Sequence, residues 1–306
     1  MLRDRAARRP TMSGPRRFRL GAIVLVVAAP LVFGCGSDRS SAPKPPCKEN
    51  GCGASTAAVS VAQRTVATTP VAVRGVYASW PYASEYPTIA GLGFNAVSVE
   101  PWRDRLDYLQ SLGLKGLVWL GGYDNSTCSF VRSDAWVTDR VLAVEDHPGV
   151  LAYEIDNEPH DYQCPTAPQQ IKDRVSLVRS LIAPYSATLY ITLSRDFSAF
   201  SGIGVDLIRI SAYPCSYQYG CAMQKIIDKV AAARAAGFSR IWGGSQTAGD
   251  NYYRPPTPAE LALIQQTWHD QGAEGYVAWT WDGHGTTTPL RTNTTLWDAW
   301  KIQDSK

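Results

Sequence analysis

The sequence predicts a closed (β/α)₈ barrel over residues 71–306, in which eight parallel strands alternate with helices. Short β-rich runs alternate with segments of helical apolar spacing, which is the pattern of parallel strands joined by crossover helices. Eight such strands in roughly 236 residues match the size of this barrel, typically about 250 residues. A doubly wound open sheet would instead carry a glycine-rich loop after its first strand, where this chain has Ala78-Ser79-Trp80-Pro81.

The predicted strands are short apolar runs that end where polar residues begin. In chain order they cover 73–78, 95–100, 115–120, 150–156, 189–193, 207–213, 240–243 and 276–281. Helical patterns cover 103–112, 135–145, 169–182, 222–236, a segment from 258 onward, and 295–302. The helix from 258 has Thr257 as its predicted N-cap and Pro258 in its first turn, both favoured at those positions.

Composition and charge indicate a globular domain with no electrostatic case for nucleic-acid binding. Of 306 residues, 45% are apolar and 19% are charged, and the formal net charge is +3. Residues 1–34 hold seven Arg and one Asp, a net charge of +6, so the remainder carries 3 − 6 = −3. A mildly acidic body does not attract a polyanion.

The N-terminal segment predicts export and lipid anchoring. Arg16, Arg17 and Arg19 precede an apolar run of 15 residues, Leu20–Gly34. A membrane-spanning helix needs about 20 residues, so this shorter run after basic residues is typical of an export signal. The run ends in Phe33-Gly34-Cys35, which resembles a bacterial lipobox and implies removal of residues 1–34 and lipidation of Cys35. Residues 35–70 then form a tether rich in Ser, Ala, Pro and Thr. We therefore expect a lipoprotein on the outer face of a bacterial cell membrane; a plain secretory signal is the alternative.

The number of cysteines agrees with the prediction that Cys35 carries a lipid, because an even number remains without it. Seven cysteines less Cys35 leave six, which an exported compartment permits to form disulfides. The sequence-close pairs Cys47/Cys52 and Cys215/Cys221 suggest local bridges, leaving Cys128 with Cys164. There is no Cys-x-x-Cys pair and the four histidines are scattered, so neither a metal nor a cofactor is predicted.

The predicted strand ends carry carboxylates, amides and aromatic rings. In a (β/α)₈ barrel the functional groups come from the carboxyl ends of the strands. Flat sugar faces stack on aromatic rings and sugar hydroxyls pair with carboxylates and amides, so we expect a glycan ligand. We expect the barrel to be a monomer. The candidate binding residues are Trp80, Glu100, Asp124, Asn157, Tyr213, Gln246, Trp279, Trp281 and His284.

The fourth strand holds three spaced acids. Glu154, Asp156 and Glu158 alternate with Ile155 and Asn157, so the two-residue period of a strand predicts that all three carboxylates point to one side. Repulsion and burial would then raise the pKa of at least one, as a proton donor to a glycosidic oxygen requires. A structural acid cluster is the alternative.

Asn157-Glu158-Pro159 at the end of this strand resembles the acid/base motif of (β/α)₈ glycoside hydrolases related to cellulases and β-mannanases. The resemblance implies that Glu158 is the acid/base and that Asn157 holds the sugar 2-hydroxyl. Those enzymes place a nucleophilic Glu at the end of strand seven, where this chain has Gln246.

Three interpretations follow from that departure. In the first, Asp282 completes the catalytic pair with Glu158, and Glu100 and Asp124 are further candidates. A separation of about 6.5–9.5 Å between the two carboxyl groups would then indicate inversion through water. Alternatively, Asp156 and Glu158 resemble the strand-four acids of chitinase-type enzymes, which implies substrate assistance over Trp279 or Trp281. In the third, catalysis is lost and a carbohydrate-binding barrel remains. A structural cell-wall protein would lack a cleft at the strand ends.

Overall fold

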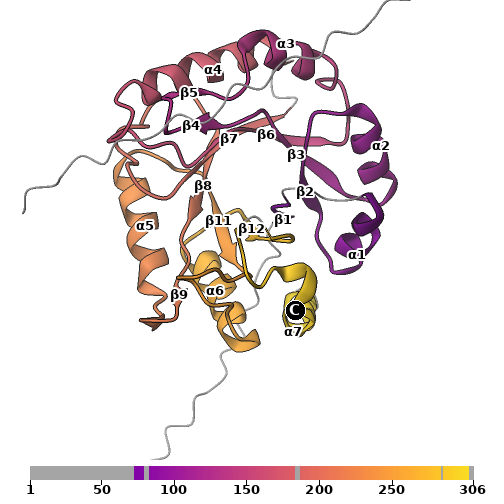
Figure 1. Cartoon of the computed structure of the whole chain (residues 1–306), viewed down its shortest axis with the longest axis vertical. Helices are drawn as coiled ribbons and strands as arrows, with labels where there is room; N and C mark the ends of the chain where they lie inside the picture. The colour runs from indigo at the N-terminus through magenta and orange to yellow at the C-terminus, as the bar shows by residue number, and fades with distance from the viewer. Residues whose placement is uncertain (1–71, 79–82, 183–186, 284, 303–306) are drawn as a thin grey trace, which may run out of the picture. The chain divides into compact units, whose positions relative to one another are not determined.

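Eight parallel strands close into a barrel in the computed structural model, which describes residues 72–78, 83–182, 187–283 and 285–302. The barrel order is β1-β12-β11-β8-β7-β6-β3-β2, and the helices form an outer ring around it (Figure 1). The predicted fold class is confirmed. The predicted export signal and tether, with Cys35, Cys47 and Cys52, lie outside the described residues, as do Trp80 and His284.

The barrel strands begin and end within a few residues of their predicted positions. They are β1 (Val73–Val76), β2 (Ala96–Val99), β3 (Lys115–Trp119), β6 (Val150–Asn157), β7 (Thr188–Leu193), β8 (Leu207–Ser211), β11 (Ile241–Gln246) and β12 (Gly275–Trp279). Two short hairpins not predicted from the sequence follow β3 and β8: β4 (Tyr123–Asp124) with β5 (Ser129–Phe130), and β9 (Cys215–Ser216) with β10 (Gly220–Cys221).

The helices of the outer ring include every one that the apolar spacing predicts. They are α1 (Tyr86–Gly91), α2 (Arg103–Ser111), α3 (Asp134–Leu142), α4 (Ala167–Leu181), α5 (Gln224–Ala235), α6 (Pro258–Asp270) and α7 (Thr294–Ile302), with 3₁₀ turns η1 (Ala83–Glu85) and η2 (Leu290–Thr292). Helix α1 was not predicted. At α6, Thr257 accepts from the Glu260 backbone and the Glu260 side chain accepts from Thr257 N, which confirms the predicted N-cap as a capping box. Within the described residues, no helix has the length and apolarity needed to cross a membrane.

The barrel interior is filled by side chains. One residue from each of the eight strands contributes to a buried cluster: Val73, Ala96, Leu117, Ala152, Tyr190, Leu207, Trp242 and Val277. The largest of these, Tyr190 and Trp242, have ring centroids 5.3 Å apart. The barrel is therefore a packed core, and any ligand has to bind at its mouth.

A β-bulge in β6 changes which way its acids point. Glu154 is opposite Tyr190 of β7, but Asp156 is opposite Ile191 and Asn157 is opposite Thr192, so two residues of β6 face one of β7. The extra residue breaks the two-residue alternation after Glu154. The expectation that Glu154, Asp156 and Glu158 share one side is therefore wrong.

In the described part of the chain, one disulfide joins the first hairpin to the segment before α4 and another closes the second hairpin on itself. Cys128, in the β4–β5 turn, is bonded to Cys164, which precedes α4. Cys215 and Cys221 join β9 to β10. Both pairings agree with the predicted ones.

Candidate functional site

Glu158 directly follows β6 and lines a pocket of about 420 Å³ at the carboxyl ends of β6, β7 and β8. The pocket is lined by Glu158, Ser194, Arg195, Ser211, Tyr213, Lys229 and Tyr253. Glu158 is half-buried, and its carboxyl group makes no hydrogen bond or ion pair with any residue in the described part of the chain. Of these lining residues Glu158 is the one carboxylic acid. The strand ends of this barrel thus form a cleft, as a ligand-binding protein requires.

The backbone of Glu158 is held in an unusual conformation. Its φ of +61° lies in the left-handed region, which costs free energy for a residue other than glycine. Three contacts fix it: Glu158 N donates to Thr192 O at 2.9 Å, Asn125 Nδ2 donates to Glu158 O at 3.1 Å, and Asn125 Oδ1 accepts from His160 N at 2.8 Å. Asn125 therefore positions the turn that aims Glu158 into the pocket, and the Cys128–Cys164 disulfide anchors the same hairpin.

Aromatic rings form one wall of the site. Tyr213 stacks on Trp279 with ring centroids 4.6 Å apart and packs edge-on against Tyr253 at 5.4 Å. Burial raises the pKa of Tyr213, and the nearby Glu158 charge raises it further. The phenol therefore stays protonated and can donate a hydrogen bond. Tyr213 lies in the pocket and Trp279 lies behind it, as members of the predicted binding set.

Two cations lie on the pocket surface. Lys229, in α5, donates from Nζ to Ser211 O at 2.7 Å, and burial lowers its pKa although the charge of Glu158 acts in the opposite direction. Arg195 follows β7, is exposed, and has its guanidinium 5.6 Å from the ring centre of Tyr162.

Asn157 and Asp156 lie on opposite sides of β6. Asn157 is exposed, and Arg209 donates to its Oδ1 at 3.5 Å. Asp156 is 0% exposed, accepts from Tyr123 N at 2.6 Å, and does not line the pocket. The expectation that Asp156 acts directly on a sugar is therefore not supported. The chitinase-type interpretation needs both Asp156 and Glu158 in the site, and the pocket holds only Glu158 of the two.

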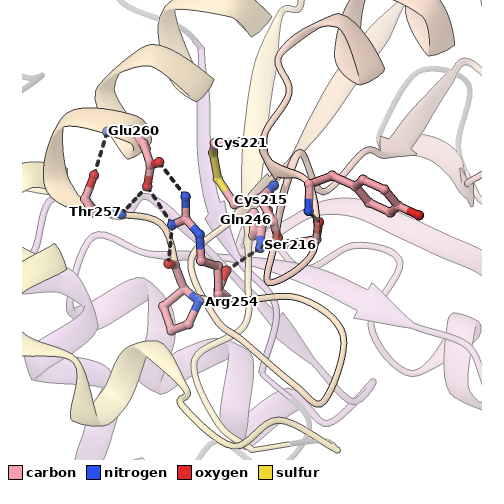
Figure 2. Close-up of polar contacts among 9 residues, drawn as sticks. Cys215, Ser216, Cys221, Gln246, Arg254, Thr257 and Glu260 are labelled. Carbon is pink, nitrogen blue, oxygen red and sulfur yellow. Dashed lines mark hydrogen bonds and ion pairs between the residues drawn. A yellow bond between two sulfur atoms is a disulfide. The ribbon is translucent and has the colours of Figure 1, made fainter.

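Gln246 is a structural residue rather than a binding residue. It is 0% exposed; its Oε1 accepts from Cys215 N at 2.8 Å, and its Nε2 donates to Cys215 O at 2.9 Å and Arg254 O at 2.8 Å. Figure 2 shows this side chain between the Cys215–Cys221 hairpin and the segment that leads to α6. Since both amide hydrogens are already used within the protein, the predicted contact of Gln246 with substrate is wrong.

The remaining predicted residues are not in the pocket. Trp281 is 1% exposed, donates to Glu85 Oε2 at 2.7 Å and stacks on Trp297, so it belongs to the core. Asp282 is 6% exposed and does not line the pocket. Glu100 accepts from Trp102 Nε1 at 2.9 Å, and Asp124 accepts from Ser126 within its own hairpin, which lowers the pKa of Asp124. The structure does not bring any of these three acids to Glu158 as a pocket partner.

Sequence reasoning missed several site residues for identifiable reasons. Ser194 directly follows the predicted strand 189–193, and Ser211 ends β8 two residues before the predicted end of that strand, so both lie close to positions that the pattern selects. Lys229 lies in the middle of α5 and Tyr253 in a loop, and no strand-end rule selects such positions. Asn125 acts through backbone groups 33 and 35 residues away, a pairing that depends on the tertiary fold.

The fold of the chain is similar to barrels found in solved structures of glycoside hydrolases. No protein-family model matches the sequence, and no curated protein matches it. Among solved structures, a β-galactosidase from the psychrophilic Marinomonas ef1 is similar with a TM-score of 0.56 at 13% identity, over 76% of this chain and 58% of its own length. An endo-1,4-β-D-mannanase from Thermotoga petrophila gives 0.54 at 13% identity over 75% and 99%.

An endo-β-1,4-glucanase from Xanthomonas axonopodis gives a TM-score of 0.52 at 12% identity, over 75% of this chain and 94% of the glucanase. The barrel is the one shared by these enzymes. At such low identity the likeness concerns the fold, and function has to be argued from the site.

Proposed function

We propose that this protein is a glycoside hydrolase in which Glu158 donates a proton to the glycosidic oxygen. The observation that carries the proposal is the placement of the Glu158 carboxyl group, which has no ion-pair partner among the described residues, on a strained and braced turn in a pocket at the barrel mouth. Strained backbone that neighbouring residues hold in place is typical of functional sites. The similarity of fold to a mannanase and a glucanase supports the same reaction class.

The surroundings of Glu158 suit this role. Tyr213 presents a protonated phenol beside it, and Tyr213 and Tyr253 supply the pocket lining with aromatic rings of the kind on which sugars pack. Arg195, on the pocket lining, is exposed to solvent, so a water molecule can reach a bound sugar. The proposal assigns the proton donor alone.

Replacing Glu158 by Gln tests this assignment. The amide keeps the shape of the side chain but cannot donate the proton, so we expect kcat to fall by about 10²- to 10⁴-fold while ligand affinity survives. Release of reducing ends from a panel of bacterial and plant polysaccharides measures turnover, and calorimetry measures affinity. Glu145→Gln, an acid that does not line the pocket, is the matched control. Equal turnover by Glu158→Gln and the native protein would refute the role.

A non-catalytic carbohydrate-binding barrel is the second candidate function. It is favoured by Gln246, whose amide is committed to the backbone of Cys215 and Arg254 where related barrels have a nucleophilic Glu. This candidate predicts measurable affinity of the native protein for a glycan and no release of reducing ends from any polymer.

We further propose that the protein is exported and anchored through a lipid on Cys35. The support is the basic and apolar N-terminal segment that ends in Gly34-Cys35. Expressed in a bacterium fed a radioactive fatty acid, the native chain should be labelled and sediment with membranes, whereas Cys35→Ser should be unlabelled. Labelling of Cys35→Ser would contradict the site, and an unlabelled native chain in the culture medium would indicate plain secretion.

A further inference from the structure

The pocket around Glu158 holds more positive than negative charge. Its charged lining groups are Glu158, Arg195 and Lys229. In the part of the chain that the structure describes, neither Arg195 nor Lys229 forms an ion pair, although Glu158 is near enough to act on Lys229 electrostatically. Two unpaired cations therefore share one cavity with a single acid.

The charge excess belongs to the lining itself. Asp196 lies near Arg195 but outside the lining, and burial together with the adjacent Asp161 raises the pKa of Asp196. Lys225 adds a further positive charge near Lys229.

The proposed reaction makes the imbalance larger. In the form that donates a proton Glu158 is neutral, so only the two cations remain on the lining. A neutral sugar that displaces water from such a surface would leave two cations without a counter-charge, which is unfavourable. An anionic group on the sugar would instead form charge-assisted hydrogen bonds with both.

The two side chains are arranged to hold such a group. Lys229 Nζ donates one hydrogen to Ser211 O and keeps two others, so its ammonium is fixed in direction without being saturated. Arg195 packs against Tyr162, and its planar fork matches a carboxylate, sulfate or phosphate. Ser194 and Ser211, two residues that carry hydroxyl groups, belong to the same lining.

We propose that this pocket binds a sugar that carries an anionic group, held between Arg195 and Lys229, so that the substrate is an acidic glycan. The inference rests on the proposed glycosidase function and specifies its substrate class. Carboxylate, sulfate and phosphate share the chemistry that these cations recognise, and the experiment distinguishes among them.

Binding to the full-length Glu158→Gln variant tests the proposal without turnover. Calorimetry would compare three acidic sets with matched neutral forms: uronic-acid oligosaccharides and their carboxyl-reduced products, sulfated oligosaccharides and their desulfated products, and phosphorylated oligosaccharides and their dephosphorylated products. We expect one acidic set to bind at least tenfold more tightly than its neutral form, and the affinity to fall as salt rises. Adding Arg195→Gln or Lys229→Met should weaken that binding by about ten- to hundredfold.

Lys225→Met is the control, because Lys225 is on the same helix and outside the lining, and it should change affinity less than threefold. Equal binding of acidic and neutral forms would overturn the proposal, as would wild-type affinity in both Arg195→Gln and Lys229→Met. Hydrolysis of a neutral glycan by the native protein would overturn the substrate class and leave the glycosidase function standing. Failure to bind or cleave any glycan would overturn both.

Discussion

Three acids that lie close together in the sequence, on β6 or directly after it, have different environments. Glu154 is inside the barrel against Arg209, Asp156 is buried under Tyr123, and Glu158 is in the pocket. The bulge between Glu154 and Asp156 produces this separation. The alternation of acids along the sequence could not reveal it, because a bulge depends on which residues of β7 the strand pairs with.

Asp156 should make stability depend on pH. Burial raises its pKa to about 7 from an unfolded value near 3.8, against the opposing hydrogen bond from Tyr123. Below about pH 4 both states hold the proton; between pH 4 and 7 only the folded state does, so stability falls by up to about 1.4 kcal/mol per pH unit and then levels off.

The Asp156→Asn variant removes this titration, and its Oδ1 still accepts from Tyr123 N. We therefore expect its stability relative to the native protein to rise steadily between pH 4 and 7 and to remain constant above. Thermal unfolding at unit pH steps measures the difference. A difference independent of pH would show that the Asp156 carboxyl titrates alike in both states.

The side chain of Gln246 connects β11 to the β9–β10 hairpin and to the segment that leads to α6. Its amide binds Cys215 of β9 and the carbonyl of Arg254, and Arg254 in turn pairs with Glu260 in the first turn of α6 at 2.6 Å (Figure 2). The strands and most helices were predictable because their apolar residues repeat at the period of each element. The roles of their end residues were not, since Gln246 meets backbone groups that only the folded chain brings together.

Replacing Gln246 by Glu should not create the nucleophile that the Asn157-Glu158-Pro159 resemblance implies at the end of this strand. A carboxylate cannot donate to Cys215 O and Arg254 O, so two carbonyls would face an acceptor, at a cost of about 2–5 kcal/mol. We expect the melting temperature to fall by about 5–15 °C, with no gain in glycan hydrolysis. Gln110→Glu, on the exposed face of α2, is the matched control and should change little. Increased hydrolysis by Gln246→Glu would contradict the structural role.

The whole barrel closes around an interior that is partly apolar and partly charged. Beside the apolar cluster, the Glu154–Arg209 pair is buried, with Arg209 Nη2 3.2 Å from Glu154 Oε1, and Thr192 Oγ1 donates to the same oxygen at 2.8 Å. Burial acts to lower the pKa of Arg209, but the Glu154 carboxylate together with Tyr190, Tyr213 and Tyr77 outweighs burial, and the net shift is upward. Strands β6, β7 and β8 each contribute one group, so this network links the strands whose ends form the pocket.

Removing one partner of this pair should cost more than removing both charges. Arg209→Met leaves the Glu154 charge buried without a cation, and we expect a loss of about 3–5 kcal/mol in the free energy of unfolding. In the double variant Glu154→Gln/Arg209→Met no buried charge remains, so part of that loss should be recovered. Denaturant unfolding of the native protein, both single variants and the double variant gives the coupling energy. Additive losses would mean that Glu154 and Arg209 do not stabilise the barrel as a pair.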